Sequence, residues 1–167
     1  MDGDDLTVVE SRKDVDTLTL VVATELAAPP EKVWDVWADP RKLERWWGPP
    51  TWPATFVHHD FVAGGEARYY MTGPEGEKAH GWWRFTRISP TDGLAFDDGF
   101  ADDSGEPQEG GPVIHGTVTL DGTATGTRMT ITSRFDTLEQ MEEVVAMGML
   151  EGITGALGQI DAILAEA

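Results

Sequence analysis

The side chains best suited to proton transfer near neutral pH are four histidines, His58, His59, His80 and His115. No two are four residues apart and no His-Glu-x-x-His segment occurs, so the helical histidine pair of zinc proteases is missing. A histidine in an apolar cavity beside a carboxylate can act as a general acid or base, and His58, His80 and His115 are candidates. His58 and Asp60 share a face of an expected strand, which leaves open a metal site with a third ligand. We interpret all four as surface or cavity-rim residues, and predict neither metal nor cofactor.

Nucleophilic and phosphate-binding motifs are missing from the sequence. It has no cysteine, which excludes disulfides and thiol chemistry, and it has no Gly-x-Ser-x-Gly elbow. Gly64-Gly65 lacks the lysine and the following helix of a phosphate-binding loop, so we interpret it as a turn or bulge. Segment 97–111 carries acidic charges only, and it is either a solvated loop or a gate that attracts cations. Its acidic residues are Asp97, Asp98, Asp102, Asp103, Glu106 and Glu109.

The composition is typical of an acidic globular protein. The chain has 167 residues, 40% of them hydrophobic, and a net charge of −18. This charge opposes binding to nucleic acid and to anionic lipid, because both interactions require neutralisation of phosphate. No apolar run approaches the roughly 20 residues that span a bilayer, and the first residues are acidic, so we expect a cytoplasmic protein without membrane insertion. Residues 1–15 predict a flexible acidic tail, followed by a single domain over 16–167.

The elements that would position these residues are strands separated by turn signals. A β-branched strand is expected at 17–26, followed by two short helices marked by Pro29-Pro30, Asp39-Pro40 and Gly48-Pro49. The short separations between the remaining strands favour antiparallel pairing. These strands are expected at 55–60, 66–71, 80–88, 94–100, 113–120 and 127–135.

The C-terminal region predicts one long helix from about Thr137 to Ala165. Apolar residues recur there at spacings of three and four. Gly148, Gly152 and Gly155 run beside this stripe and allow either close approach to the sheet or room for a ligand. The order of elements therefore predicts an α+β fold, with a curved antiparallel sheet wrapped around a long C-terminal helix.

Tryptophans concentrate at the two short helices and just after them, where five of the seven lie. Side chains this bulky form either a core wedge or the wall of a cavity. Together with the strand residues expected to face inward and the stripe of the long helix, they predict an apolar ligand pocket. Its candidate wall residues are Trp37, Trp46, Phe56, His58, Tyr69, Met71, Trp82, Phe96, His115, Met129 and Met149.

Seven short segments, in their order along the chain, resemble a known family. They are similar to homologues of the activator of heat-shock-protein-90 ATPase, in the START-like or Bet-v-1-like superfamily, also called SRPBCC. The resemblance covers residues 17–164 and implies the helix-grip fold, with a cavity between the sheet and the C-terminal helix. The matching segments are 33–40, 43–49, Gly64-Gly65, 73–76, Ile88-Ser89-Pro90, 126–131 and Gly152.

The resemblance does not imply one activity, because family members bind lipids, hormones or polyketides, act as cyclases, or contact chaperones. We predict a protein that binds a small hydrophobic or aromatic ligand. The alternative is an enzyme of the cyclase/dehydratase or hydrolase kind that uses a cavity His, Tyr or carboxylate. A second alternative is a chaperone-interacting protein, and a chaperone or homodimer contact stays open. Ile153 stands where many relatives carry Trp, and segment 97–111 is longer than usual, so the ligand's identity does not carry over.

Overall fold

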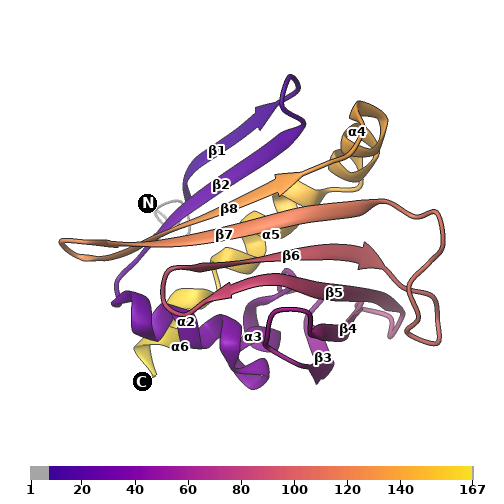
Figure 1. The fold of residues 1–167 in the computed structure, drawn as a ribbon. Helices are drawn as coiled ribbons and strands as arrows, with labels where there is room; N and C mark the ends of the chain where they lie inside the picture. Colours follow the sequence, from indigo (N-terminus) through magenta and orange to yellow (C-terminus); the bar gives the residue numbers. More distant parts are fainter. Residues whose placement is uncertain (1–7, 167) are drawn as a thin grey trace.

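Eight strands form one antiparallel sheet in the computed structural model of the chain, which describes residues 8–166 (Figure 1). The strand order is β1-β2-β8-β7-β6-β5-β4-β3, so β3 to β8 form a meander and β2 pairs with its last strand. The predicted antiparallel sheet is therefore confirmed. The strands are β1 (Val8–Asp14), β2 (Thr19–Leu26), β3 (Ala54–His59), β4 (Glu66–Thr72), β5 (Lys78–Ser89), β6 (Gly93–Phe100), β7 (Val113–Thr123) and β8 (Gly126–Arg134).

Strand β1 corrects one prediction. Residues 8–14 were expected in a flexible tail, but they pair with β2 and extend the sheet. The segment is polar because it lies at the edge of the sheet, where Glu10 contacts Arg128 with an N–O distance of 2.9 Å. Residues 1–7 of the predicted tail lie outside the described residues.

The two short helices follow β2 as predicted. They are α2 (Pro30–Ala38) and α3 (Pro40–Trp46), each with a proline in its first turn. Asp39 ends the first helix and caps the second, because its side chain accepts a hydrogen bond from the backbone N–H of Arg41 at 2.9 Å. Both helices bury their tryptophans, and this fixes the aromatic side chains against the sheet.

The C-terminal region forms three helical segments, so the prediction of one continuous helix is wrong. They are α4 (Leu138–Ala146), α5 (Met149–Leu157) and α6 (Ile160–Ala165), and they follow one another across one face of the sheet (Figure 1). Gly148 breaks the first junction because its φ of +96° is left-handed, a conformation that glycine adopts without strain. The sheet with its C-terminal helices still forms the predicted helix-grip arrangement of the α+β class.

The face of the sheet that the helices cover, here called the inner face, carries most of the core. Trp37 is fully buried, and its indole N–H donates to the Met129 sulfur at 3.3 Å. Its ring lies 4.8 Å from that of Trp46, centroid to centroid. A second, smaller core cluster contains Phe135 and Met141, and Leu150 packs against both clusters.

Side-chain contacts tie the last two helices to the end of α3. The Gln159 amide donates to the carbonyl oxygens of Gly48 at 2.8 Å and Trp46 at 3.3 Å. A Cβ added to Gly155 would lie 3.4 Å from Pro49, an ordinary contact distance to the loop after α3. A Cβ added to Gly152 would meet no atom within 4 Å. The two glycines therefore differ: Gly155 lies in contact with the loop after α3, whereas Gly152 borders open space.

Candidate functional site

The sheet register brings a carboxyl group onto the inner face of β6. Leu94, Phe96 and Asp98 alternate along this strand and share one side of it. Asp98 pairs with Trp83 on β5 and with Ile114 on β7. Its neighbours in the sheet are thus apolar or aromatic, and the carboxyl group lies where an apolar side chain is usual.

Tyr69 lies on β4, which β5 separates from β6, and its side chain crosses β5 to reach this carboxyl group. Its hydroxyl donates to Asp98 Oδ1 at 3.2 Å. The Tyr69 ring can cross β5 because Gly81 lies beneath it, where an added Cβ would come within 2.5 Å of the ring. The two residues form what we call the aspartate–tyrosine pair.

Gly81→Ala is expected to lower the free energy of unfolding by about 1–3 kcal/mol, because the added methyl group must displace the Tyr69 ring. Urea unfolding measures the loss. Gly111→Ala is the matched control, since the atom nearest its added Cβ is 3.6 Å away, and a change below about 0.5 kcal/mol is expected there. Equal effects of the two substitutions would contradict the close packing of Tyr69 on Gly81.

Two buried indole N–H groups lie beside the pair. Trp47 and Trp83 contact each other edge to face, with ring centroids 4.7 Å apart, and each also contacts Tyr69. The Trp83 indole is directed at the Asp98 carboxyl group, and both indoles are directed at the Tyr69 hydroxyl. The site thus gathers the polar atoms of this face around one carboxyl group.

Burial controls the ionisation of the aspartate–tyrosine pair. It raises the pKa of Asp98 from 3.8 to about 7, while Tyr69 and Trp83 act in the opposite direction by stabilising the carboxylate. Burial, followed by the Asp98 charge, also raises the pKa of Tyr69 well above its usual value. Tyr69 therefore keeps its proton, and Asp98 changes its protonation near neutral pH.

Asp98 combines this shielding with partial solvent access. The residue as a whole is half-buried, although desolvation dominates its pKa. Half-buried apolar residues pack around the same core, among them Trp47, Met71, Leu150 and Ile153. The arrangement can hold the polar group of a small molecule whose remaining surface is apolar.

Most of the predicted wall residues lie on the inner side of the sheet or on the helices that cover it. Tyr69 belongs to the site, Met71 packs against the larger core cluster, and Met149 packs against the smaller one. Whether they line a ligand cavity stays a prediction. The fully packed members of the larger cluster are Trp37, Trp46, Phe56, Phe96 and Met129.

Three predicted wall residues face the other way, and these assignments are wrong. Trp82 lies on the outer face over Gly99, while Trp83, which was not predicted, points inward. His115 is also on the outer face, where it contacts Asp97 at 2.7 Å and Asp136 at 3.0 Å. An error of one position inverts the face of every residue in a strand, which explains Trp82.

A β-bulge explains the third wrong assignment, His58. The register of β3 against β4 shifts between Phe56 and His58, so His58 pairs with Arg68 on the outer face and is exposed. His59 takes the inner position, and its Nε2 lies 3.1 Å from the Trp37 carbonyl oxygen. Burial lowers the pKa of His59, which favours the neutral ring. This histidine holds β3 against α2.

Asp98 itself was assigned to the acidic segment 97–111. The alternation of Leu94, Phe96 and Asp98 along one strand is the sequence signal that could have assigned it to the inner face. Among residues 8–166, no group of three or more His, Asp or Glu side chains could hold a metal ion.

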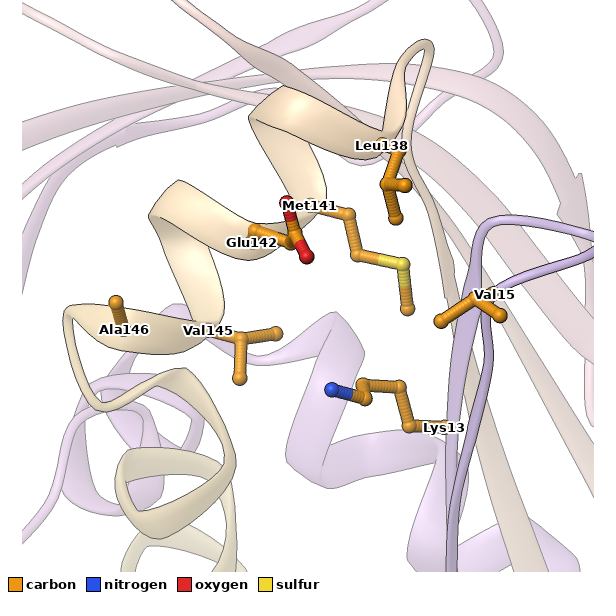
Figure 2. A pocket seen from close by; sticks show the side chains of 7 residues that line it. All are labelled: Lys13, Val15, Leu138, Met141, Glu142, Val145 and Ala146. Atoms are coloured by element: carbon orange, nitrogen blue, oxygen red, sulfur yellow. The ribbon is translucent and has the colours of Figure 1, made fainter.

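A separate surface pocket of about 200 Å³ lies between α4 and the end of β1 (Figure 2). Figure 2 shows the Lys13 side chain and Val15 on one side and the α4 residues opposite them. This pocket does not include the aspartate–tyrosine pair. Its lining residues are Lys13, Val15, Leu138, Met141, Glu142, Val145 and Ala146. No helix within the described part of the chain is long and apolar enough to cross a membrane.

Comparisons with known proteins match nearly the whole chain. A protein of Arthrobacter aurescens with a solution NMR structure is 54% identical, with 96% of this chain and 94% of that chain covered and a TM-score of 0.91. A Mycobacterium smegmatis protein with a crystal structure is 43% identical over 94% of this chain and 96% of its own, with a TM-score of 0.87. The AHSA1 protein of Silicibacter pomeroyi, at 23% identity, 88% and 97% coverage and a TM-score of 0.71, shares the fold. None of the curated proteins matches.

The family assignment agrees with the architecture. The profile described as "Activator of Hsp90 ATPase homolog 1-like protein" matches residues 27–165, from the residues before α2 to the end of α6. This range contains the helix pair, the six strands β3 to β8 and all three C-terminal segments. The chain therefore belongs to the family of activator of Hsp90 ATPase homolog 1-like proteins, within the SRPBCC superfamily.

Proposed function

We propose that the chain binds a small, largely apolar ligand between the inner face of the sheet and α5, with the ligand's polar group at the aspartate–tyrosine pair. The observation that carries this proposal is the half-buried Asp98, whose carboxyl group lies beside Tyr69 on an otherwise apolar face. The indole N–H groups of Trp47 and Trp83 are directed at the same pair, so the polar atoms of this face converge on one point.

The position of the site between the two core clusters supports the proposal. Ile114, the β7 neighbour of Asp98, belongs to the smaller cluster, whereas Trp83, its β5 neighbour, belongs to the larger one. Leu150 on α5 packs against both clusters. The left-handed Gly148 separates α5 from α4, and a hinge at this glycine would let α5 move to admit a ligand.

The chemistry of the site favours binding over catalysis. The predicted enzyme alternative uses a cavity His, Tyr or carboxylate, and of these Tyr69 and Asp98 come together without a histidine of residues 8–166 beside them. The inner histidine of the described chain, His59, faces the Trp37 carbonyl oxygen instead. The tyrosine proton is also held firmly, because burial raises the pKa of Tyr69. Ligand binding is therefore the role that requires no catalytic side chain beyond those present at the site.

The test uses N-phenyl-1-naphthylamine, a neutral apolar dye whose emission rises in apolar surroundings. We expect binding in the micromolar range, equivalent to about 8 kcal/mol. Leu150→Trp should weaken binding at least about tenfold, because the larger side chain fills the space between the clusters. Glu151→Trp, at the exposed neighbouring position, is the matched control and should bind as the wild type does.

The outcome is decisive because the two variants carry the same new side chain at consecutive positions of one helix. Absence of dye binding to the wild-type protein would contradict the proposal. So would equal loss in both variants, since this would indicate a surface site or a general disturbance of α5. Circular dichroism confirms that each variant is folded.

A contact with a chaperone is the second candidate, and the family match over residues 27–165 is the observation that favours it. The two candidates use different parts of the molecule. Ligand binding depends on the interior, whereas a chaperone would meet the exposed, acidic surface. Leu150→Trp should therefore weaken ligand binding and leave a chaperone contact unchanged.

A further inference from the structure

We propose that the surface pocket between α4 and the end of β1, here called the α4 pocket, is a second binding site, and that its ligand is a protonated amine with a short apolar body. The pocket does not include the aspartate–tyrosine pair, so this site is independent of the interior one. Its cavity, the apolar side chains exposed at its rim and the charges around it support the assignment (Figure 2).

The wall of the α4 pocket is mostly apolar. Five of its seven lining residues are apolar, and they come from α4 and from the turn after β1. Met141 is buried in the smaller core cluster, which ties the pocket to the core. Val15 and Leu138, one from each side of the cavity, are 51% and 44% exposed. Exposed apolar side chains that gather at a cavity, with polar residues around them, are typical of a binding site.

Two charged side chains complete the lining, Lys13 from β1 and Glu142 from α4. Neither forms an ion pair or a hydrogen bond within residues 8–166. The Glu142 carboxylate is therefore free to accept hydrogen bonds from the ammonium group of a ligand. Lys13 opposes a cation with a single charge, while its aliphatic stem adds to the apolar wall.

The charge around the pocket is negative and favours a cation over an anion. Four further carboxyl groups are adjacent in the sequence to lining residues, whereas the adjacent cation, Arg12, is paired with Glu10 at an N–O distance of 3.3 Å. Ala146, a lining residue, is the last residue of α4, so the negative end of the helix dipole lies at the pocket. The last turn of α4 carries no basic side chain. The four carboxyl groups belong to Asp14, Asp16, Glu139 and Glu143.

The experiment compares hexylamine, 1-hexanol and hexanoate, which share a six-carbon chain and differ in charge. Affinities are measured at about pH 7, where the amine is protonated and the acid is ionised, from NMR shifts of the Val15 and Leu138 methyl groups. Hexylamine should bind about fivefold more tightly than hexanol, which is the effect expected of one solvent-exposed ion contact. Hexanoate should bind more weakly than hexanol.

Two charge variants test the roles of the lining residues. Glu142→Gln should weaken hexylamine about fivefold and leave hexanol unchanged. Glu31→Gln on α2 is the matched control, because it alters the net charge equally at an exposed position outside the pocket, and it should change neither affinity. Lys13→Met removes the like charge and keeps the apolar stem, so it should strengthen the binding of hexylamine.

Two tryptophan substitutions test the location. Ala146→Trp fills the cavity and should weaken hexylamine and hexanol at least about fivefold. Met147→Trp, at the next position but outside the lining, should bind both ligands as the wild type does. Leu150→Trp, which is designed to block the interior site, should also leave the binding of hexylamine unchanged.

Hexanoate binding as tightly as hexylamine would overturn the inference, as would equal effects of Glu142→Gln and Glu31→Gln. Equal losses in Ala146→Trp and Met147→Trp, or methyl groups of Val15 and Leu138 that do not shift with hexylamine, would also overturn it. None of these results affects the proposed function, which depends on N-phenyl-1-naphthylamine and the interior of the protein. If hexylamine shifts the Trp47 and Trp83 indoles instead, the amine occupies the interior site and the α4 pocket is not its binding site.

Discussion

Trp37→Ala is expected to lower the free energy of unfolding by about 3–5 kcal/mol, because it removes a fully buried indole and leaves a cavity. The Trp37 ring contacts four other aromatic rings, with centroid distances of 4.8 to 6.1 Å. It also donates its N–H to Met129 on β8, so one side chain joins α2 to the far part of the sheet. Urea unfolding followed by circular dichroism measures the loss, and the melting temperature should fall by roughly 10 °C.

Trp82→Ala is the control for this substitution. Trp82 is half-buried on the outer face of β5, so its removal should cost clearly less than that of Trp37. Equal losses from the two positions would contradict the assignment of Trp37 to the centre of the core.

Asp98→Asn is expected to stabilise the protein above pH 7 and to leave it unchanged below about pH 4. In the folded state the pKa of Asp98 is raised from 3.8 to about 7, so between these values the folded protein holds a proton that the unfolded chain has released. The stability of the wild type therefore falls as pH rises through this window, by at most about 4 kcal/mol. The neutral amide of the variant removes this dependence.

The measurement is the difference in unfolding free energy between wild type and variant from about pH 4 to about pH 8. Taking the difference cancels the other carboxyl groups of this acidic chain. Asp103→Asn, at an exposed position, should give no pH-dependent difference. If the gain in unfolding free energy caused by Asp98→Asn stays constant with pH, or grows as pH falls, the pKa of this carboxyl group is not raised by burial.

The order of elements was predictable because it depends on local patterns. β-branched runs and turn residues marked the strands, and Pro40 and Gly48 bounded the second short helix. The break at Gly148 was not predictable in the same way, since a helix interior can contain glycine and the apolar spacing continues across the junction. Strand β1 was missed because edge strands can be polar on both faces.

The site depended on information that is less local. Tyr69 and Met71 were predicted to face inward, and the structure places Tyr69 inside. Trp82 and His58 were assigned to the wrong faces, because a strand pattern defines two faces without saying which is inner, and a bulge inverts them. Asp98 was overlooked because its acidic neighbours suggested a solvated loop. Only the pairing of β5 with β6 shows that it lies beside Trp83.

The most direct test of the interior binding site is an NMR titration of the tryptophan indole N–H groups with N-phenyl-1-naphthylamine. We expect the resonances of Trp47 and Trp83 to shift progressively and the ligand to show cross-relaxation with Tyr69. The resonance of Trp82, on the outer face, should remain in place. Shifts confined to the α4 pocket around Lys13 and Leu138, with the Trp47 and Trp83 indoles unchanged, would contradict it.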